Sequence, residues 1–405
     1  MNILYIEHYA GSPDMGMEFR PYYLSLEWLK RGHNVTIIAG DYSHLRKKNP
    51  EVTEDFQREY IDGIEYVWLK TGKYEGNGIS RALTMERFVR KLFMHSRMIA
   101  DKWKPDVVIA SSTYPLDAYP AYRIAKHAKC RYIHEVHDMW PATLYEIGGM
   151  SKKNPFVVLM QMAENYAYKH CDKCVSLLPN SKEYMVKHGL APEKFVNIQN
   201  GVVLEEWKNP DPIPEEHKKF FDNHSKSFIV GYFGGHALSN ALDSVLDTAK
   251  HCEDKDVVFV LVGDGVEKNR LIKRKTEEGI DNVFFLPSVN KKAVPNLIAE
   301  FDCVIITGIP SPLYRFGICL NKIYDSMMAG KPIICTIPAD NTLIEQFECG
   351  IQIHDGDTCD YCKAIQKIKE MPEADKKEMG MKGKRAVQSF FTYDKLAAQF
   401  EILFK

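Results

Sequence analysis

The most informative set of reactive residue types lies in the stretch Ser311–Ile334, SPLYRFGICLNKIYDSMMAGKPII. Gly317 opens a loop, and Asn321 or a neighbour can cap the helix that follows. Lys322 and Asp325 stand three residues apart in that helix, which places them on one face. A lysine beside loop amides can hold a diphosphate, and a nearby carboxylate can accept hydrogen bonds from ribose hydroxyls. The alternative, a surface ion pair on an ordinary helix, stays open here.

A second candidate pair, His137 and Asp138, follows a predicted strand in the sequence EVHDMWP. Ligands of open parallel sheets bind beyond the carboxyl ends of strands, where this pair lies. A histidine there can donate a hydrogen bond to a ligand hydroxyl, and Asp138 can accept one or orient the imidazole. The alternative is a loop histidine satisfied by its own neighbours, because the chain has 14 histidines.

Three strand-to-helix loops carry glycines that could expose backbone amides to an anion. Gly16 lies in the loop after the first strand, Gly234 and Gly235 form a turn in the second half, and Gly263 ends the run FVLVG. Such loops lead into helix N-termini, whose amides and dipole attract phosphate. Turn chemistry alone also produces glycines at strand ends, so the prediction depends on their combination.

The elements that must position these residues are short apolar runs alternating with stretches of helical periodicity. This alternation predicts an α/β protein with parallel sheets covered by helices on both faces. The predicted strands are Asn2–Glu7, Asn34–Ala39, Ile64–Lys70, Asp106–Ala110, Arg131–Val136, Lys173–Leu178, Ser227–Phe233, Asp256–Val262, Asn282–Leu286, Asp302–Ile306, Lys331–Thr336 and Gly350–His354.

The chain of 405 residues is long enough for two domains. Prolines at 210, 212 and 214, among many charges, predict a linker over 206–226 between domains at 1–205 and 227–390. Residues 391–405 have apolar side chains at helical spacing and are expected to form a closing helix.

The composition excludes several classes of function. Hydrophobic residues make up 45% and charged residues 26%, with a net charge of −1, which argues against a nucleic-acid partner. No apolar run approaches the roughly 18–20 residues that span a bilayer. The opening residues do not resemble a secretory signal, so the ten cysteines are expected to be reduced thiols in the cytoplasm.

Two further motifs have competing interpretations. The pairs Cys171/Cys174 and Cys359/Cys362 suggest zinc, but neither has a second ligand pair nearby, so incidental thiols are favoured. Tyr122 and Lys126 form a Y-x-x-x-K pair typical of short-chain dehydrogenases. Without the dinucleotide-binding glycines, a partly solvated helix face explains the pair better.

Taken in order, several motifs resemble the retaining glycosyltransferases of the family 4 class, with the GT-B fold. These motifs are the N-terminal glycine loop, RGHNVTII, HDMWP, IQNGV, YFGG, LVGDG, FLPSV and NKIYDSMMAGKPII, which span residues 1 to about 340. The resemblance implies two Rossmann-like parallel-sheet domains facing across a cleft. It is greatest to transferases that build capsular polysaccharide or O-antigen.

The resemblance also implies roles for individual residues. His137 would contact the transferred sugar, with Asp138 beside it, and Asp325 would take the place of a glutamate that holds the donor ribose. Donor-binding residues would be Gly16, Gly234, Gly235, Gly263, Pro287, Ser288, Val289, Arg315, Gly317, Asn321, Lys322 and Asp325. The substrate would be a nucleoside-diphosphate sugar, with UDP as the expected carrier. No metal or other cofactor is expected.

Two departures from the family pattern affect the donor site. Many relatives carry an Arg and a Lys after the first strand of the second domain, where this chain reads GGHALSNALD. Arg315 or Lys322 is expected to supply the missing charge. The usual pair of glutamates eight apart is also incomplete, because Gly317 stands eight residues before Asp325.

The segment Ser80–Lys104 has seven basic and two acidic residues, with apolar Met85, Phe88, Val89, Leu92 and Phe93 at helical spacing. Such a helix can lie on an anionic membrane surface, or it can pack its apolar side on the domain core. Polymer-building relatives use lipid-linked acceptors. Peripheral contact at the inner face of the plasma membrane is therefore one expectation for this cytoplasmic protein.

The leading hypothesis is retaining transfer of a hexosyl or acetamidohexosyl group to a glycan or polyprenyl-diphosphate-linked acceptor in surface polysaccharide biosynthesis. One alternative is a nucleotide-sugar epimerase on the same fold, which would need a pair of acid/base carboxylates that the sequence does not place. Another is a catalytically silent binding subunit, suggested by the missing Arg and Lys.

Overall fold

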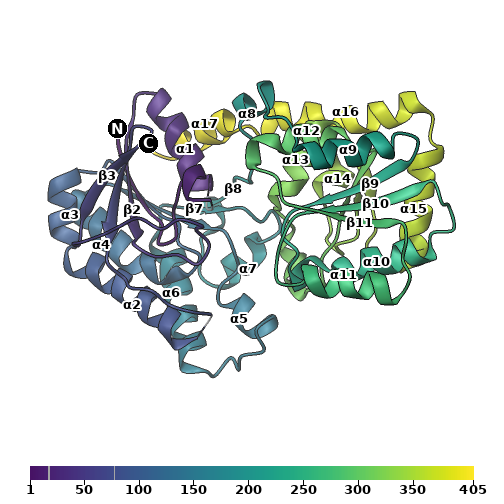
Figure 1. Cartoon of the computed structure of the whole chain (residues 1–405). Helices are drawn as coiled ribbons and strands as arrows, with labels where there is room; N and C mark the ends of the chain where they lie inside the picture. The colour runs from purple at the N-terminus through teal and green to yellow at the C-terminus, as the bar shows by residue number, and fades with distance from the viewer. Residues whose placement is uncertain (17–18, 77) are drawn as a thin grey trace. The chain divides into compact units, whose positions relative to one another are not determined.

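The computed structural model describes residues 1–16, 19–76 and 78–405, and they form two compact units (Figure 1). Unit 1 comprises Met1–Gln199 together with Tyr393–Lys405, and unit 2 comprises Asn200–Thr392. The first crossing between the units therefore falls six residues before the predicted end of the first domain at 205. The chain returns to unit 1 for its last helix.

Unit 1 contains an eight-stranded sheet with the order β3-β4-β2-β1-β5-β6-β7-β8. Only the pairing of β3 with β4 is antiparallel, which confirms the predicted parallel sheet. The strands are β1 (Asn2–Ile6), β2 (Asn34–Gly40), β3 (Gln57–Ile61), β4 (Ile64–Leu69), β5 (Val107–Ala110), β6 (Arg131–Val136), β7 (Lys173–Ser176) and β8 (Phe195–Asn197).

Two of these strands, β3 and β8, are absent from the sequence prediction. The sequence of β3, QREYI, is polar and largely exposed, because the strand lies at the edge of the sheet and has no buried face. The opposite edge strand, β8, is only three residues long. Neither strand has the apolar run by which the others can be recognised.

Helices cover both faces of the unit 1 sheet (Figure 1). On one face, α4 packs against α2, α3 and α6, and on the other α1 packs against α17. The helices of this unit are α1 (Phe19–Lys30), α2 (Ile79–Met94), α3 (Ser96–Trp103), α4 (Ala118–Ala128), α5 (Ala142–Glu146), α6 (Pro155–His170), α7 (Lys182–Lys187) and α17 (Tyr393–Ile402).

The predicted closing helix at the chain's end is α17, and it packs on α1 in unit 1. The buried Trp28 indole donates a hydrogen bond of 3.1 Å to the carbonyl of Ala397, and its ring lies edge-on to Phe400. Arg31 forms an ion pair of 3.2 Å with Glu401. These contacts show that α1 covers the apolar face of this helix.

Unit 2 has a six-stranded, fully parallel sheet with the order β11-β10-β9-β12-β13-β14, which is the order 3-2-1-4-5-6 of a Rossmann fold. Every residue of the central strands β9 and β10 is buried, because helices cover both of their faces. The strands are β9 (Phe228–Phe233), β10 (Val257–Val262), β11 (Val283–Leu286), β12 (Cys303–Ile306), β13 (Ile333–Cys335) and β14 (Gly350–Gln352).

Two helical layers enclose this sheet, each built around its own hydrophobic cluster. Residues of α9, α12, α13 and α16 join one cluster, and residues of α10, α11 and α15 join the other. The helices are α8 (Leu204–Lys208), α9 (Glu215–Asn223), α10 (Leu242–His251), α11 (Lys268–Glu277), α12 (Val294–Ala299), α13 (Asn321–Ala329), α14 (Leu343–Gln346), α15 (Thr358–Glu370) and α16 (Glu373–Phe390).

The predicted linker 206–226 differs from the structure, where it is part of unit 2 and contains most of α8 and all of α9. Phe221 is buried in the core, and the buried His217 ring hydrogen-bonds the carbonyl of Pro287 at 2.9 Å. The three prolines precede α9, and Pro214 is its N-cap residue. Proline is tolerated before the first turn of a helix, so the cluster marks a helix start.

Candidate functional site

The strand order reverses once in each sheet, between β1 and β5 in unit 1 and between β9 and β12 in unit 2. In open parallel sheets, ligands bind beyond the carboxyl ends of the strands at such switch points. The residues that follow β9, β10 and β11 in unit 2, and β1, β5 and β6 in unit 1, are therefore the places to look for chemistry.

In unit 2, the structure brings together the predicted glycines at the ends of β9 and β10. Gly234 and Gly235 are exposed, and the Gly234 amide donates to the Val262 carbonyl at 3.0 Å. A Cβ atom on Gly263 would lie 1.9 Å from the Gly234 carbonyl oxygen. The two loops can approach this closely only because Gly263 has no side chain. They leave bare backbone at the carboxyl edge of the sheet.

The side chain of Lys322 reaches this glycine loop from the first turn of α13. Its ammonium group donates hydrogen bonds to the Tyr232 hydroxyl at 3.0 Å and to Asn240 Oδ1 at 3.1 Å. The Lys322 nitrogen would lie 3.6 Å from a Cβ atom placed on Gly234. Among the described residues, no carboxylate lies within 4.0 Å of it, and burial lowers its pKa to about 8. A half-buried cation with neutral partners is suited to receive an anion.

Asp325, which the sequence placed on the same helix face, has a different partner. Only 5% exposed, it accepts hydrogen bonds from the Lys291 ammonium group at 2.9 and 2.7 Å, one to each oxygen. Lys322 and Asp325 therefore do not form the surface ion pair considered as an alternative. The sequence analysis did not identify Lys291. Its position after β11, four residues beyond Pro287, is the signal that could have identified it.

The other predicted donor-binding residues, in α13 and in the segment that precedes it, are less closely grouped. Gly317, with φ of 91°, ends the short turn Pro312–Phe316. Asn321 is exposed as the first residue of α13 rather than its cap, which is Leu320. Arg315 is exposed and lies over the Phe316 ring at 4.2 Å. Of the two cations expected to replace the missing pair, Lys322 is the one beside the glycines.

The predicted donor-binding residues Pro287, Ser288 and Val289 follow β11. Pro287 and Ser288 are exposed, whereas Val289 packs against the hydrophobic cluster that contains α13. The carbonyl of Pro287 accepts the hydrogen bond from His217 in α9. This loop is thus held from behind by the segment that was expected to be a linker.

In unit 1, His137 follows β6 with its side chain 16% exposed. Its Nε2 atom lies 2.8 Å from the Ser111 hydroxyl oxygen and 3.4 Å from Glu135 Oε2. Glu135 is a carboxylate in contact with the imidazole, and the expectation that the exposed Asp138 accepts a hydrogen bond or orients the imidazole stays a prediction.

Glu135 itself is buried and is surrounded by donors from distant parts of unit 1. Arg20 pairs with its Oε1 atom at 2.9 Å, and the hydroxyls of Tyr5 and Ser111 donate to Oε2 at 2.5 and 2.6 Å. Burial alone would raise the pKa of Glu135, but Arg20 and the hydrogen bonds from His137 and Ser111 hold it well below its usual range. The sequence analysis did not identify Glu135, and the signal that could have identified it is a glutamate within a buried strand.

Gly16 ends a short helical turn, Pro13–Met15, in the loop after β1. Its φ of 88° is left-handed, and its added Cβ would lie 3.0 Å from the Lys47 side chain. The Lys47 amide donates to the Met15 carbonyl at 2.8 Å. The left-handed backbone therefore favours glycine at this position.

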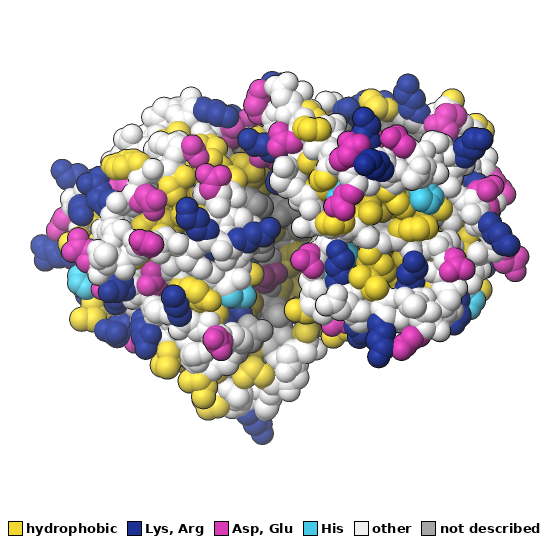
Figure 2. Space-filling view, in the orientation of Figure 1, with side chains coloured by type: hydrophobic (Ala, Val, Ile, Leu, Met, Phe, Trp, Pro, Cys, Tyr) yellow, Lys and Arg dark blue, Asp and Glu magenta, His cyan; other side chains and the backbone are white. Residues whose placement is uncertain are grey.

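The basic segment Ser80–Lys104 falls in α2 and α3. Met85, Phe88 and Leu92 are buried, so most of the predicted apolar stripe packs on the core of unit 1. Figure 2 shows Lys and Arg side chains interspersed with hydrophobic ones over this part of the surface. The exposed basic residues are Arg87, Arg90, Arg97, Lys102 and Lys104. Among the described helices, none is both long and apolar enough to cross a membrane.

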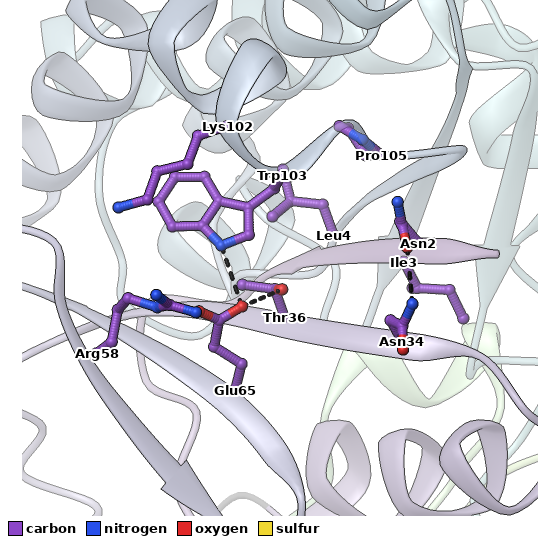
Figure 3. A pocket seen from close by; sticks show the side chains of 10 residues that line it. All are labelled: Asn2, Ile3, Leu4, Asn34, Thr36, Arg58, Glu65, Lys102, Trp103 and Pro105. Atoms are coloured by element: carbon purple, nitrogen blue, oxygen red, sulfur yellow. Dashed lines mark hydrogen bonds and ion pairs between the residues drawn. The ribbon is translucent and has the colours of Figure 1, made fainter.

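A cavity of about 290 Å³ lies at the opposite edge of the unit 1 sheet, near the amino ends of β1 and β2 (Figure 3). The Glu65 carboxylate at its wall already accepts hydrogen bonds from Thr36 and from the Trp103 indole at 2.9 and 3.1 Å. Because parallel sheets bind ligands at the other edge, this cavity is not the candidate site. Within the described ranges, His, Cys, Asp and Glu side chains form no group of three that could hold a metal.

Comparison with known families identifies the class of protein. Residues 15–206 match the family model described as Glycosyltransferase Family 4, and residues 227–370 match Glycosyl transferases group 1. The chain belongs to the family 4 type of glycosyltransferases, and its two Rossmann-like units have the GT-B fold.

Particular relatives agree with this class. The chain is 22% identical over 288 residues to WcaI of Escherichia coli K12, assigned as a colanic acid biosynthesis glycosyl transferase, covering 69% of this chain and 70% of WcaI. It is 22% identical over 267 residues to WbjE of Pseudomonas aeruginosa, assigned as a glycosyltransferase, covering 64% of each chain.

Solved structures share the fold along the whole chain. Sucrose-phosphate synthase from Thermosynechococcus elongatus matches with a TM-score of 0.75 at 16% identity, covering 100% of this chain and 98% of its own. HepE from Anabaena, solved in complex with UDP, matches with a TM-score of 0.69 at 16% identity, covering 99% of both chains. WaaG, a glycosyltransferase involved in lipopolysaccharide biosynthesis, matches with a TM-score of 0.67 at 12% identity, covering 99% of both chains.

Proposed function

We propose that the protein transfers a hexosyl or acetamidohexosyl group, with retention, from a nucleoside-diphosphate sugar to a glycan or polyprenyl-diphosphate-linked acceptor in surface polysaccharide biosynthesis. The observation that carries the proposal is Lys322, a half-buried ammonium group with only neutral partners beside the bare Gly234–Gly235 loop. The names of WcaI and WaaG support the biosynthetic setting. The UDP in the HepE complex supports UDP as the carrier.

In this proposal, unit 2 binds the donor. The amides near Gly234 and Gly235 and the Lys322 ammonium group bind the diphosphate, Asp325 accepts from the ribose hydroxyls, and the loop after β11 flanks the base. Asp325 is already pre-oriented by Lys291, which would hold its oxygens in place for the ribose. In unit 1, His137 contacts the transferred sugar.

The chemical step breaks the bond between the sugar C1 and the diphosphate oxygen, and forms a bond from the acceptor oxygen to C1 on the same face. The acceptor proton passes to the leaving diphosphate. Negative charge on the diphosphate grows during this step, and a positioned ammonium group stabilises it without reorganisation. Lys322 therefore supplies the charge stabilisation, and the proposal needs no metal ion.

We also propose that the enzyme works in the cytoplasm and contacts the inner face of the plasma membrane peripherally. The exposed basic residues of α2 and α3 support electrostatic contact with anionic lipid, whereas the buried stripe Met85, Phe88 and Leu92 does not support insertion. Co-sedimentation with phosphatidylserine vesicles at low and high salt tests this. Binding that persists at high salt, or that needs no anionic lipid, contradicts it.

The central experiment is a thermal-shift screen against a panel of nucleotide sugars, followed by transfer assays with the best ligand. We expect one UDP-sugar to raise the melting temperature and to be consumed only when an acceptor is added, with the same rate after EDTA treatment. Conversion of the donor sugar without acceptor would favour an epimerase. Binding without turnover would favour a silent subunit.

A further inference from the structure

Unit 2 has a second lysine whose ammonium group lies at the loops that contain Gly234, Gly235 and Gly263. Lys268 is the first residue of α11, and its side chain is half-buried. Its Nζ atom donates hydrogen bonds to the carbonyl of Gly263 at 2.7 Å and to the carbonyl of Leu286 at 3.2 Å. The side chain therefore joins the glycine loop after β10 to the end of β11.

The charge of Lys268 has no acidic partner in the part of the chain that the structure describes. The adjacent carboxylate, Glu267, pairs with Arg270 at 2.6 Å, and Asp264 accepts from the amide of Gly265 at 2.8 Å. An ammonium group has three N–H donors, and the two carbonyls use two of them. One donor and the whole positive charge are therefore available to a ligand.

The charges of Lys268 and Lys322 act on the same side chain, the buried ring of His236. Burial and these two ammonium groups lower the pKa of His236 to about 4, with Asp264 opposing them. A Cβ atom on Gly263 would lie 3.2 Å from His236 Nε2, so the ring packs against the glycine whose carbonyl accepts from Lys268. A neutral imidazole cannot offset a positive charge. Two ammonium groups thus act on one small region in which the histidine neutralises neither.

We propose that Lys268 is a second donor-binding residue, whose ammonium group binds the diphosphate together with Lys322. This rests on the proposed function for the identity of the ligand. The two lysines come from helices in opposite layers, α11 and α13, and they would supply the charge for which many relatives use the Arg and Lys absent from GGHALSNALD. Two cations without carboxylate partners favour a ligand with several negative charges, which a diphosphate has.

The first test compares UDP with uridine on the full-length chain. Calorimetry measures the affinity for UDP, and ligand-observed NMR titration measures the affinity for uridine. In Lys268→Met, we expect the UDP affinity to fall by about tenfold or more and the uridine affinity to stay within about twofold, because uridine has no phosphate. Equal losses for the two ligands overturn the proposal, since Lys268 would then only hold the two loops together. An unchanged UDP affinity overturns it as well.

Two further variants separate the charge of Lys268 from its hydrogen bonds, and they remain informative if Lys268→Met does not fold. Lys268→Gln keeps a donor for the carbonyls but removes the charge, and should lose as much UDP affinity as Lys268→Met. Lys268→Arg keeps the charge and should stay within about threefold of the unmodified chain. The matched control is Lys273→Met in the same helix, an exposed lysine that pairs with Glu277 at 3.6 Å and should have no effect. Full UDP affinity in Lys268→Gln contradicts the proposal.

Failure of this inference and failure of the proposed function give different results. If the unmodified chain binds UDP and the Lys268→Gln variant binds it equally well, the inference fails alone. If the unmodified chain binds UDP without transferring sugar, the transferase function fails and the variants still decide the role of Lys268. If the unmodified chain binds none of UDP, ADP and GDP, both fail.

Discussion

The carboxyl edges of the two sheets differ in whether their buried charge has an oppositely charged partner. In unit 1, the buried Glu135 is neutralised by Arg20 and by hydroxyl donors, all from the same unit. In unit 2, the Lys322 ammonium group is half-buried with a hydroxyl and an amide oxygen as partners, and no carboxylate within salt-bridge reach in the described chain. The charge at the first edge is compensated within the unit, whereas the charge at the second is available to an anionic ligand, as the proposed function requires.

The difference separates orientation from binding. A compensated buried charge such as Glu135 holds its neighbours rigidly, because every bond it accepts is needed to offset its desolvation. A buried charge without an opposite charge beside it, such as Lys322, has a desolvation cost that a bound anion would offset. The lowered pKa of Lys322 reflects that cost. We therefore expect substitutions in unit 2 to change affinity for the donor, and substitutions around His137 to change turnover.

Lys322→Ala should have the largest effect. Loss of the cation that faces the diphosphate should lower kcat/KM for the donor by about 10²–10³-fold. Steady-state kinetics with the preferred nucleotide sugar measures this, and Arg315→Ala, the exposed cation that was the other candidate, should stay within about threefold. An equal fall in kcat/KM in the two variants would contradict the special role of Lys322 at the unit 2 edge.

His137→Ala should lower kcat by about 10²-fold while leaving the affinity for UDP unchanged, because its contacts lie in unit 1 and UDP lacks the transferred sugar. Single-turnover kinetics and calorimetric titration with UDP separate the two quantities. His127→Ala, an exposed histidine on α4, is the matched control and should have no effect. If UDP binds more weakly to the His137 variant, the assignment of binding to unit 2 alone fails.

Asp325→Asn should weaken UDP binding by about tenfold, since it replaces a charged acceptor for the ribose hydroxyls with a neutral one. Lys291→Met removes only the residue that orients Asp325, and should weaken binding by about threefold. Calorimetry on both variants measures these changes. A larger loss in Lys291→Met would make Lys291 the ligand-binding group and Asp325 its support.

The last prediction concerns pH. Because burial lowers the pKa of Lys322 to about 8, its ammonium group loses its proton as the pH rises through that value. UDP binding favours the charged form, so affinity should be constant below about pH 7 and fall by about tenfold by about pH 9. Lys322→Arg should bind UDP without this dependence. A parallel decline in both proteins would assign the titration to another group.

The strand prediction was confirmed for the twelve runs that are apolar and bounded by turns, because burial on both faces leaves a strong local signal. The edge strands β3 and β8 were missed, since an edge strand needs no such run. The segment 206–226 was wrongly predicted to be a linker, because prolines that precede a helix resemble prolines that prevent one. At the site, the glycine loops could be predicted from local spacing alone.

The pairs that decide the chemistry could not be predicted in this way. Lys322 and Asp325 are neighbours along one helix, yet their partners are Tyr232 with Asn240 and Lys291. The imidazole of His137 contacts Glu135, a buried acid that the sequence analysis did not identify.

The sequence by itself determined the twelve apolar strands and the loops where glycine removes a side chain, since these depend on burial periodicity and backbone freedom. The tertiary structure alone decided which charge meets which partner. Strand order brings Tyr5 and Ser111 beside Glu135, and β9 and β11 bring Tyr232 and Lys291 to α13. Coulomb and hydrogen-bond energies act over a few ångströms in space, and separation along the chain does not reveal that distance.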